Sequence, residues 1–188
     1  MNVKVSCFSF LFILIMCVAF TNVSQGIELN PTKEQIQETI KIGEANPGKK
    51  IFKTEFVLPA IFGNWPKFGG GLVKTKLIDV AVMSAMMRKA RKSLKKEEIQ
   101  GMMGSEFLII SYRGGTDVYK IKLKQKMRLI EPKKMIKPEM GNKDPEEHAV
   151  FIAASFPYSQ LDLNAKTTIM VVKDFGTDKY EVDFSQIK

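Results

Sequence analysis

Apolar residues recur at helical spacing in the first half of the chain. The spacing predicts a helix over residues 32 to 46, and Thr32 and Gln35 stand in the positions of a capping box at its start. A longer helix is expected over 77 to 93, and a short one over 97 to 103. The apolar stripe of the long helix consists of Ile78, Val82, Met83, Met86, Met87, Ala90 and Leu94.

Two segments between these helices have no helical period. Residues 51 to 58 are rich in apolar and aromatic side chains and predict a strand that ends at Pro59. Residues 62 to 71 are rich in glycine and aromatic residues, and the three consecutive glycines at 69 to 71 predict a loop without regular structure. Trp65 in this loop is expected to cover the core.

After Gly104 the apolar period changes from helical to alternating. Residues 107 to 112 predict a strand, residues 114 to 117 a turn, and Val118 begins the expected hairpin partner. Further strands are expected over 150 to 156, 167 to 172 and 179 to 184, the last two as a hairpin. In that hairpin Tyr180 and Val182 are expected to face inward.

The order of these elements predicts the fold class. Residues 27 to 105 are helix-rich and residues 106 to 188 are strand-rich, which indicates an α+β domain with N-terminal helices packed on a mainly antiparallel sheet. The Pro- and Lys-rich stretch from 131 to 145 is interpreted as a loop or linker within one domain. An immunoglobulin-like sandwich over 106 to 188 is the alternative, and it requires about seven strands.

The start of the chain has the pattern of an export signal. Lys4 precedes an uncharged apolar run from Val5 to Phe20, and the small residues Ser24 and Gly26 suit cleavage before Ile27. The apolar run is shorter than the roughly 20 residues of a membrane-spanning helix. Residues 1 to 26 are therefore predicted to be a signal peptide, and 27 to 188 a single mature domain that is periplasmic or extracellular.

Composition narrows the chemistry of that mature domain. Both cysteines, Cys7 and Cys17, lie in the predicted signal, so the mature chain has no disulfide, zinc-thiolate site or cysteine nucleophile. The single histidine, His148, excludes zinc sites with two histidines. Without Lys4, the net charge of +9 becomes +8. The lack of disulfides and of glycosylation acceptors after residue 26 favours a bacterial source, and no metal or cofactor is predicted.

A run of alternating cations is the strongest functional signal. In a continuous strand the five cations would share one face, and across residues 120 to 137 eight basic residues accompany one acid. Neighbouring like charges repel, and a polyanion would offset that repulsion. The competing interpretation is a solvated face, or an edge strand whose lysines prevent aggregation. The cations are Lys120, Lys122, Lys124, Lys126 and Arg128.

A second basic cluster lies at the end of the long predicted helix. It includes Arg88, Arg91 and Lys92, which either complement the helix dipole or bind an acidic surface. If this cluster and the cationic run share one side of the fold, the two together indicate an anion-binding face. The expected partners are an anionic membrane surface, lipopolysaccharide or an acidic polysaccharide. Nucleic acid is the least favoured partner, since no regular aromatic residues accompany the cations.

The methionines suggest a different class of function. Candidates to line an apolar ligand site are Met83, Met86, Met87 and Trp65, although core packing explains the same pattern. The sequence contains no recognisable set of catalytic residues. The leading hypothesis is an exported non-enzymatic binding or structural domain that contacts an anionic envelope component. A carrier of a small apolar ligand and an enzyme of unknown class remain the alternatives.

Overall fold

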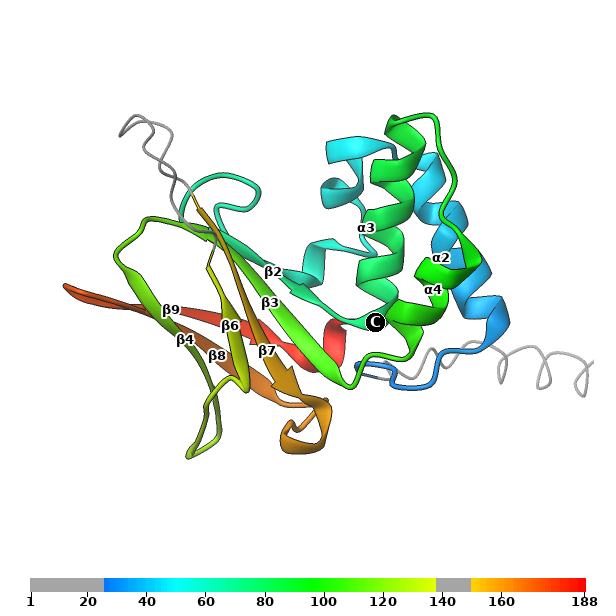
Figure 1. Ribbon diagram of the computed structural model, residues 1–188. Helices are drawn as coiled ribbons and strands as arrows, with labels where there is room; N and C mark the ends of the chain where they lie inside the picture. The colour runs from blue at the N-terminus through cyan, green and yellow to red at the C-terminus, as the bar shows by residue number, and fades with distance from the viewer. Residues whose placement is uncertain (1–25, 138–149) are drawn as a thin grey trace, which may run out of the picture.

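The computed structural model describes residues 26–137 and 150–188, and places three α-helices together at one end of the molecule (Figure 1). They are α2 (Lys33–Ala45), α3 (Lys76–Lys89) and α4 (Lys96–Met103). The capping box at the start of α2 is present, because the Gln35 amide donates to Thr32 Oγ1 at 3.2 Å and the Thr32 amide donates to Gln35 Oε1 at 2.7 Å. All three predicted helices are confirmed, each within a few residues.

Helix α3 is the centre of the helical layer, because it contacts α2, α4, β2 and the 3₁₀ helix η1 (Gly48–Lys53). It therefore buries more than one face, and the predicted single apolar stripe is only partly right. Met83, Met86 and Met87 are half-buried. Close approach of α2 depends on Gly43, where a Cβ would lie 2.4 Å from the Ala81 carbonyl oxygen. The buried residues of α3 are Leu77, Ile78, Val80, Ala81, Val82, Ser84 and Ala85.

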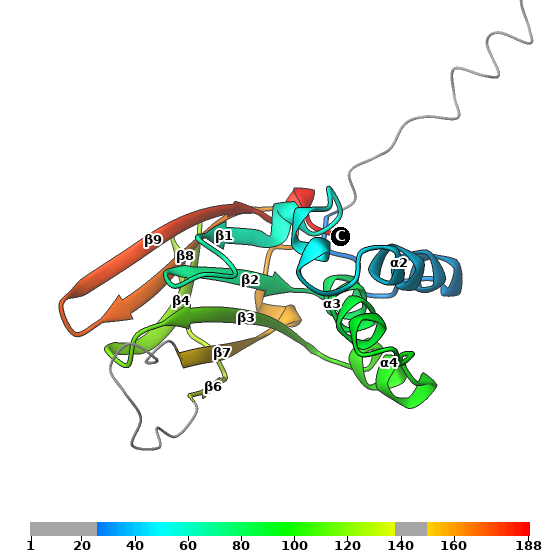
Figure 2. The same ribbon diagram turned by 90° about the horizontal axis from the view of Figure 1, so that it is seen from above.

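Two antiparallel sheets extend away from the helices (Figure 2). One has the strand order β1-β2-β3-β7-β6, and the other has the order β5-β4-β8-β9. The first consists of β1 (Ile61–Gly63), β2 (Gly70–Lys74), β3 (Phe107–Gly114), β7 (Val150–Pro157) and β6 (Lys134–Ile136). The second consists of β5 (Arg128–Ile130), β4 (Val118–Gln125), β8 (Lys166–Lys173) and β9 (Gly176–Asp183).

A single apolar cluster joins the helices to both sheets. Alternate residues of β3, such as Ile110 and Tyr112, are fully buried, as are Ile121 of β4 and Ile169 of β8. Ile78 of α3 belongs to the same cluster. The α+β class with helices N-terminal to the sheets is thus confirmed, with two sheets where one was expected.

The immunoglobulin-like alternative fails on strand order. Residues 106–188 supply seven of the described strands, β3 to β9, which is the number that this alternative needs. In an immunoglobulin sheet the second strand lies between the first and the fifth. Here the second strand of the set, β4, lies instead between β5 and β8 in the other sheet.

The strand predicted over 51 to 58 is wrong. The chain there forms η1 and a second 3₁₀ helix, η2 (Leu58–Ala60), with short-range bonds such as Thr54 N–H to the Ile51 carbonyl. Ile51 and Val57 are fully buried, so the apolar residues pack as the inner side of two tight turns rather than as one face of a strand.

The prediction that the triple glycine has no regular structure is also wrong. Gly70 and Gly71 begin β2, which pairs with β1 and β3. The pairing needs glycine, since a Cβ on Gly70 would lie 1.9 Å from the Trp65 amide nitrogen. A Cβ on Gly71 would lie 2.1 Å from Phe62 Cζ. The absent side chains leave room for the β1–β2 turn and an aromatic ring to pack on the strand.

The predicted hairpin between β3 and β4 does not form. The turn after Gly114 carries the chain from one sheet to the other, and β4 pairs with β5 and β8 instead. The expected hairpin further along is confirmed as β8–β9, with Val182 buried and Tyr180 half-buried against the core. Alternation thus identified the strands, whereas their pairing depends on contacts distant in sequence.

The first described residues, Gly26 and Ile27, pack against the rest of the fold. Ile27 is 5% exposed, and the Gly26 amide donates to Asn164 Oδ1 at 3.2 Å. The predicted signal peptide, except for Gly26, and His148 lie outside the described residues. No helix within residues 26–137 and 150–188 is long and apolar enough to cross a membrane.

Candidate functional site

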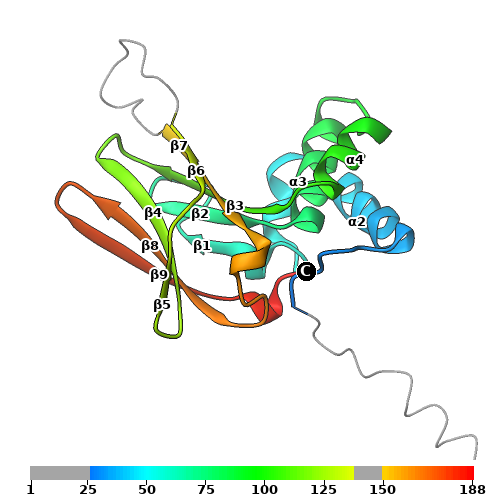
Figure 3. The same ribbon diagram turned by 60° about the horizontal axis from the view of Figure 1, so that its bottom comes forward.

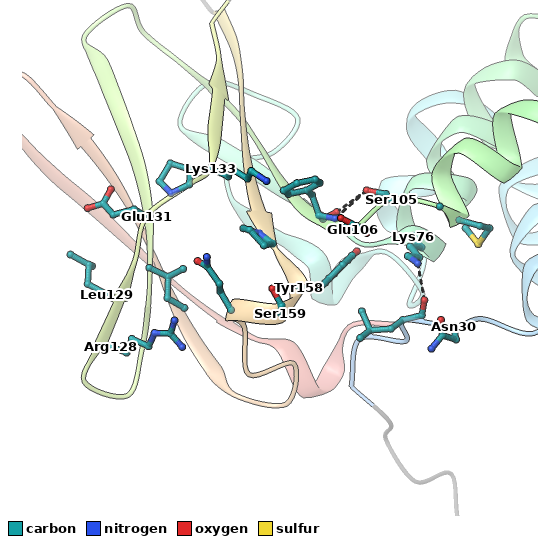
Figure 4. Close-up of a pocket in the computed structure, with 18 residues that line it drawn as sticks. Asn30, Lys76, Ser105, Glu106, Arg128, Leu129, Glu131, Lys133, Tyr158 and Ser159 are labelled. Atoms are coloured by element: carbon teal, nitrogen blue, oxygen red, sulfur yellow. Dashed lines mark hydrogen bonds between the residues drawn. The ribbon is translucent and has the colours of Figure 1, made fainter.

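An open groove of about 1100 Å³ lies between the helical layer and the edges of the two sheets (Figure 4). Five segments distant in sequence line it: the N-terminal stretch at Leu29 and Asn30, the start of α3, residues 103–107, residues 128–133, and residues 157–160. The last segment includes the 3₁₀ helix η4 (Tyr158–Gln160). Strands β5 and β6 are edge strands of their sheets, and the chain passes directly from one to the other on this side of the molecule (Figure 3).

Apolar side chains form much of the groove wall. Leu29, Phe107, Ile130 and Pro157 line it together with Tyr158, which is 8% exposed. The Tyr158 hydroxyl is buried and makes no hydrogen bond of good geometry with the described residues. Burial raises the pKa of this hydroxyl to about 12, so Tyr158 is a neutral part of the wall at physiological pH.

Three cations border the same groove. The Lys133 ammonium lies 5.3 Å from the centroid of the Phe107 ring, within cation–π range. Lys76 Nζ donates to the Leu29 carbonyl at 2.8 Å, which fixes its position. Arg128 enters from β5 and is exposed. The acids at the groove are Glu106 and Glu131.

The predicted five-residue row of cations is shorter than expected. On β4, Lys120, Lys122 and Lys124 face solvent while Ile121 and Leu123 are fully buried, as alternation requires. The strand then ends at Gln125. A tight turn with a positive φ of 54° at Lys126 reverses the chain into β5.

Arg128 consequently occupies the opposite face from the lysine row. It pairs directly with Gln125 across the β4–β5 hairpin, and directly opposed residues share a face of the sheet. Gln125 is buried on the inner face, so Arg128 projects at the edge of the groove (Figure 4). The hairpin therefore presents three lysines outward and one arginine to the groove.

Acidic residues neutralise part of the lysine row. Lys120 Nζ lies 2.8 Å from Glu131 Oε2, and Lys122 Nζ lies 2.9 Å from Glu131 Oε1. These two hydrogen bonds lower the pKa of the Glu131 carboxyl. Lys126 forms a further ion pair with Asp162 at 3.2 Å. Among the described residues, Lys124 and Arg128 are the members of the predicted row without an acidic partner.

The two basic clusters lie in different parts of the fold. Helix α3 ends at Lys89, and Arg91 has a left-handed φ of 58° in the turn that leads toward α4. Arg88, Arg91 and Lys92 are exposed there. In Figures 1 and 3 this end of α3 belongs to the helical layer, away from β4 and β5.

The proposed apolar site around the methionines is not where the groove lies. Neither Met83, Met86 and Met87 nor Trp65 lines the groove. Trp65 packs against the core, with its ring edge-on to Phe52 at 5.7 Å and to Phe151 at 5.9 Å. The groove residues Phe107, Lys133 and Tyr158 were not candidates from the sequence, because they belong to separate segments with no shared motif.

Within the described ranges, no three histidine, cysteine, aspartate or glutamate side chains gather in a way that could hold a metal ion. Comparison with protein-family models, with curated proteins and with solved structures found no match to the chain. Its function is therefore inferred from its own residues and their geometry.

Proposed function

We propose that the protein is an exported, non-enzymatic binding domain that contacts an anionic component of the cell envelope through its β4–β6 side. The observation that carries this proposal is the pair of cations without acidic partners, Lys124 and Arg128, on a hairpin whose chain segment is strongly basic. The basic residues between positions 120 and 137 are together called the basic edge. They are Lys120, Lys122, Lys124, Lys126, Arg128, Lys133, Lys134 and Lys137.

The basic edge joins the two sheets rather than belonging to one strand. Its cations lie on β4, β5, β6 and the connections between them, and all are exposed or half-buried. Cations distributed along one side raise the local concentration of a polyanion and accelerate its encounter with the protein. The contact is centred on the hairpin end, because Glu131 already engages Lys120 and Lys122.

The partner class follows from this chemistry. Phosphates and carboxylates at high density are common to an anionic membrane surface, lipopolysaccharide and acidic polysaccharides. An arginine can bind such groups through two parallel hydrogen bonds, whereas lysine contributes a flexible point charge. Contacts of this kind weaken with salt, since exposed charges are screened over about 8–10 Å at physiological ionic strength.

The proposal is tested with protein that begins at Ile27 and vesicles of phosphatidylglycerol and phosphatidylcholine. We expect binding at low salt that weakens steeply as salt rises, and a loss of about tenfold in the Lys124→Glu/Arg128→Glu variant. The matched control is Lys33→Glu/Lys41→Glu on α2, which changes the net charge equally on exposed residues elsewhere. Absent binding at low salt, or equal losses in both double variants, would contradict the proposal.

The partner class is resolved by competition. Soluble lipopolysaccharide and an acidic polysaccharide are added separately to vesicle-bound protein, and displacement by either shows that the same surface accepts it. A neutral polysaccharide of equal length is the control. Displacement by the neutral polymer would show that charge does not govern the contact.

Export is a separate part of the proposal. The apolar run and small residues before Ile27 support it, and N-terminal sequencing of the protein from its native cells tests it. We expect a chain that starts at Ile27. An intact Met1 in the folded protein would contradict export by cleavage.

A further inference from the structure

We infer that the groove is a second binding site, and that its ligand is a single anionic amphiphile, an alkyl chain that ends in a carboxylate or a phosphate. This goes beyond the contact of the basic edge with a polyanion, because the groove provides an apolar wall as well as cations. The ligand is defined by that pairing of chemistries, whether the molecule comes from solution or from a membrane.

The apolar part of the groove lining comes from separate elements. Phe107 begins β3, Ile130 ends β5, and Tyr158 begins η4, yet all three line the groove with Leu29 of the N-terminal stretch. Met103 at the end of α4 extends the same lining. An alkyl chain that lies along these side chains loses its contact with water on one side. This removal of apolar surface from water favours its binding.

Three cations lie beside these apolar side chains. Lys133 is placed over the Phe107 ring, so a positive charge lies directly next to an apolar surface. Lys76 is anchored by the Leu29 carbonyl and retains two further N–H donors. Arg128 lies on the β5 side of the same groove. A ligand with an anionic end and an apolar body matches this arrangement at both ends.

The acids of the groove do not cancel this preference. Glu131 is bound by Lys120 and Lys122, which lie outside the groove lining, so its charge is already balanced. The one remaining acid, Glu106, carries less charge than the three cations Lys76, Lys133 and Arg128 together. The groove lining therefore keeps a net positive charge. A cationic amphiphile of the same length is therefore disfavoured.

The size of the groove sets the scale of the ligand. Its volume of about 1100 Å³ exceeds the space of a small inorganic anion and is slightly above the range of typical ligand pockets. Because the groove is open, affinity should keep rising as the alkyl chain lengthens, rather than level off at a short chain. A fully buried methylene changes affinity roughly fourfold, and we expect about twofold per methylene here.

Calorimetric titration of the protein beginning at Ile27 tests this inference with monomeric ligands. The probes are hexanoate, octanoate and decanoate, decyl phosphate, decanol as the uncharged control, and decyltrimethylammonium as the cationic control. We expect affinity to rise with chain length and to fall at least about fivefold for decanol and decyltrimethylammonium. Equal binding of decanoate, decanol and decyltrimethylammonium, or no dependence on chain length, would overturn the inference.

Two variants distinguish this site from the rest of the basic edge, to which Lys133 also belongs. Lys133→Gln removes the cation over Phe107 and should weaken decanoate binding severalfold. Lys124→Gln makes the same change of charge outside the groove, and should weaken vesicle binding while leaving decanoate binding unchanged. Lys133→Gln without effect on decanoate overturns the groove site, whereas vesicle binding indifferent to Lys124→Gln counts against the basic edge alone.

The wild-type chain-length series keeps the inference testable if a groove variant fails to fold. Circular dichroism melts identify such a variant. In addition, decanoate below its micelle concentration distinguishes a ligand in solution from a lipid in a bilayer. Binding to vesicles that competes with decanoate places lipid chains in the groove, and binding that does not compete assigns vesicle contact to the basic edge.

Discussion

Lys122 of β4 donates to Glu131 across the β4–β5 hairpin, with Nζ 2.9 Å from Oε1. The other carboxylate oxygen of Glu131 is occupied by Lys120, so one acid restrains two cations of the lysine row. The repulsion expected of a bare row of lysines is thus reduced within the protein itself. Under the proposed function, Glu131 limits how many cations of the basic edge are free to contact an anion.

Replacing Glu131 by glutamine should strengthen binding to anionic vesicles. The change frees Lys120 and Lys122, and we expect an increase of roughly twofold to fivefold at low salt, since exposed ion pairs are individually weak. The measurement is the vesicle affinity of Glu131→Gln against that of Glu38→Gln, which removes an exposed acid from α2. An equal gain from both variants would mean that net charge alone is responsible.

Acid should have the same effect on the wild type. The two lysines lower the pKa of the Glu131 carboxyl below its ordinary value of 4.5. The ion pairs of Glu131 therefore persist above the lowered pKa, and they are lost as the pH falls through it. Vesicle binding should rise over that range in the wild type more than in Glu131→Gln. Phosphatidylglycerol vesicles are suitable because their phosphodiester stays ionised.

Gln125 should be essential to the hairpin. Its side chain is 5% exposed, its Nε2 donates to the Asp162 carbonyl and to Thr167 Oγ1, each at 2.9 Å, and its Oε1 accepts from the Asp162 amide at 2.9 Å. Gln125→Leu removes two hydrogen bonds to the Asp162 backbone and one to the buried Thr167 hydroxyl, and should lower the free energy of unfolding by about 1–3 kcal/mol. Urea unfolding measures it, and Gln100→Leu on exposed α4 should change it by less than about 0.5 kcal/mol.

Local periodicity accounts for what could be predicted from the sequence. Helical spacing identified α2, α3 and α4, and alternation identified β3, β7 and the β8–β9 hairpin. These signals depend on neighbouring residues alone. The α+β class follows from their order along the chain, and so it was accessible without any knowledge of which elements touch.

What could not be predicted depends on distant or unusual contacts. No local signal marks the turn at Lys126, where a residue other than glycine adopts a positive φ, and so the row of cations was read as one strand. Gly70 lies in β2 at a point where the β1–β2 turn packs so closely that a side chain would not fit. The groove combines Leu29, Phe107 and Tyr158 from distant segments, and only the fold brings them together.

Two glycine-to-alanine changes should have opposite effects. A Cβ on Gly70 would meet backbone atoms, the Trp65 amide nitrogen at 1.9 Å among them, so Gly70→Ala should destabilise the protein by about 1–3 kcal/mol. Gly101 lies within α4 with nothing within 4 Å of the new Cβ, so Gly101→Ala should stabilise it by about 0.5–1 kcal/mol. Urea unfolding of both measures the difference. A neutral Gly70→Ala would show that the β1–β2 turn can move away.

Alkaline pH should lower the stability of the fold through its buried tyrosine hydroxyls. Burial raises the pKa of Tyr158 to about 12 and also raises that of Tyr112, which is fully buried. In the unfolded chain a tyrosine ionises near pH 10. The folded state therefore keeps protons that the unfolded state releases, and the stability contributed by these groups is intact below about pH 10 and is lost as pH rises toward 12.

The variant Tyr158→Phe isolates one of these groups. It removes a buried hydroxyl that has no hydrogen-bond partner of good geometry among the described residues, so its stability near pH 8 should match or slightly exceed that of the wild type. Between pH 10 and about 12 its free energy of unfolding should decline less than that of the wild type, because one titrating hydroxyl is gone. Urea unfolding across this range measures the two slopes, and ultraviolet absorbance measures the ionisation of the folded protein. Equal slopes, or a late-ionising component that survives in Tyr158→Phe undiminished, would show that the Tyr158 hydroxyl is accessible to water.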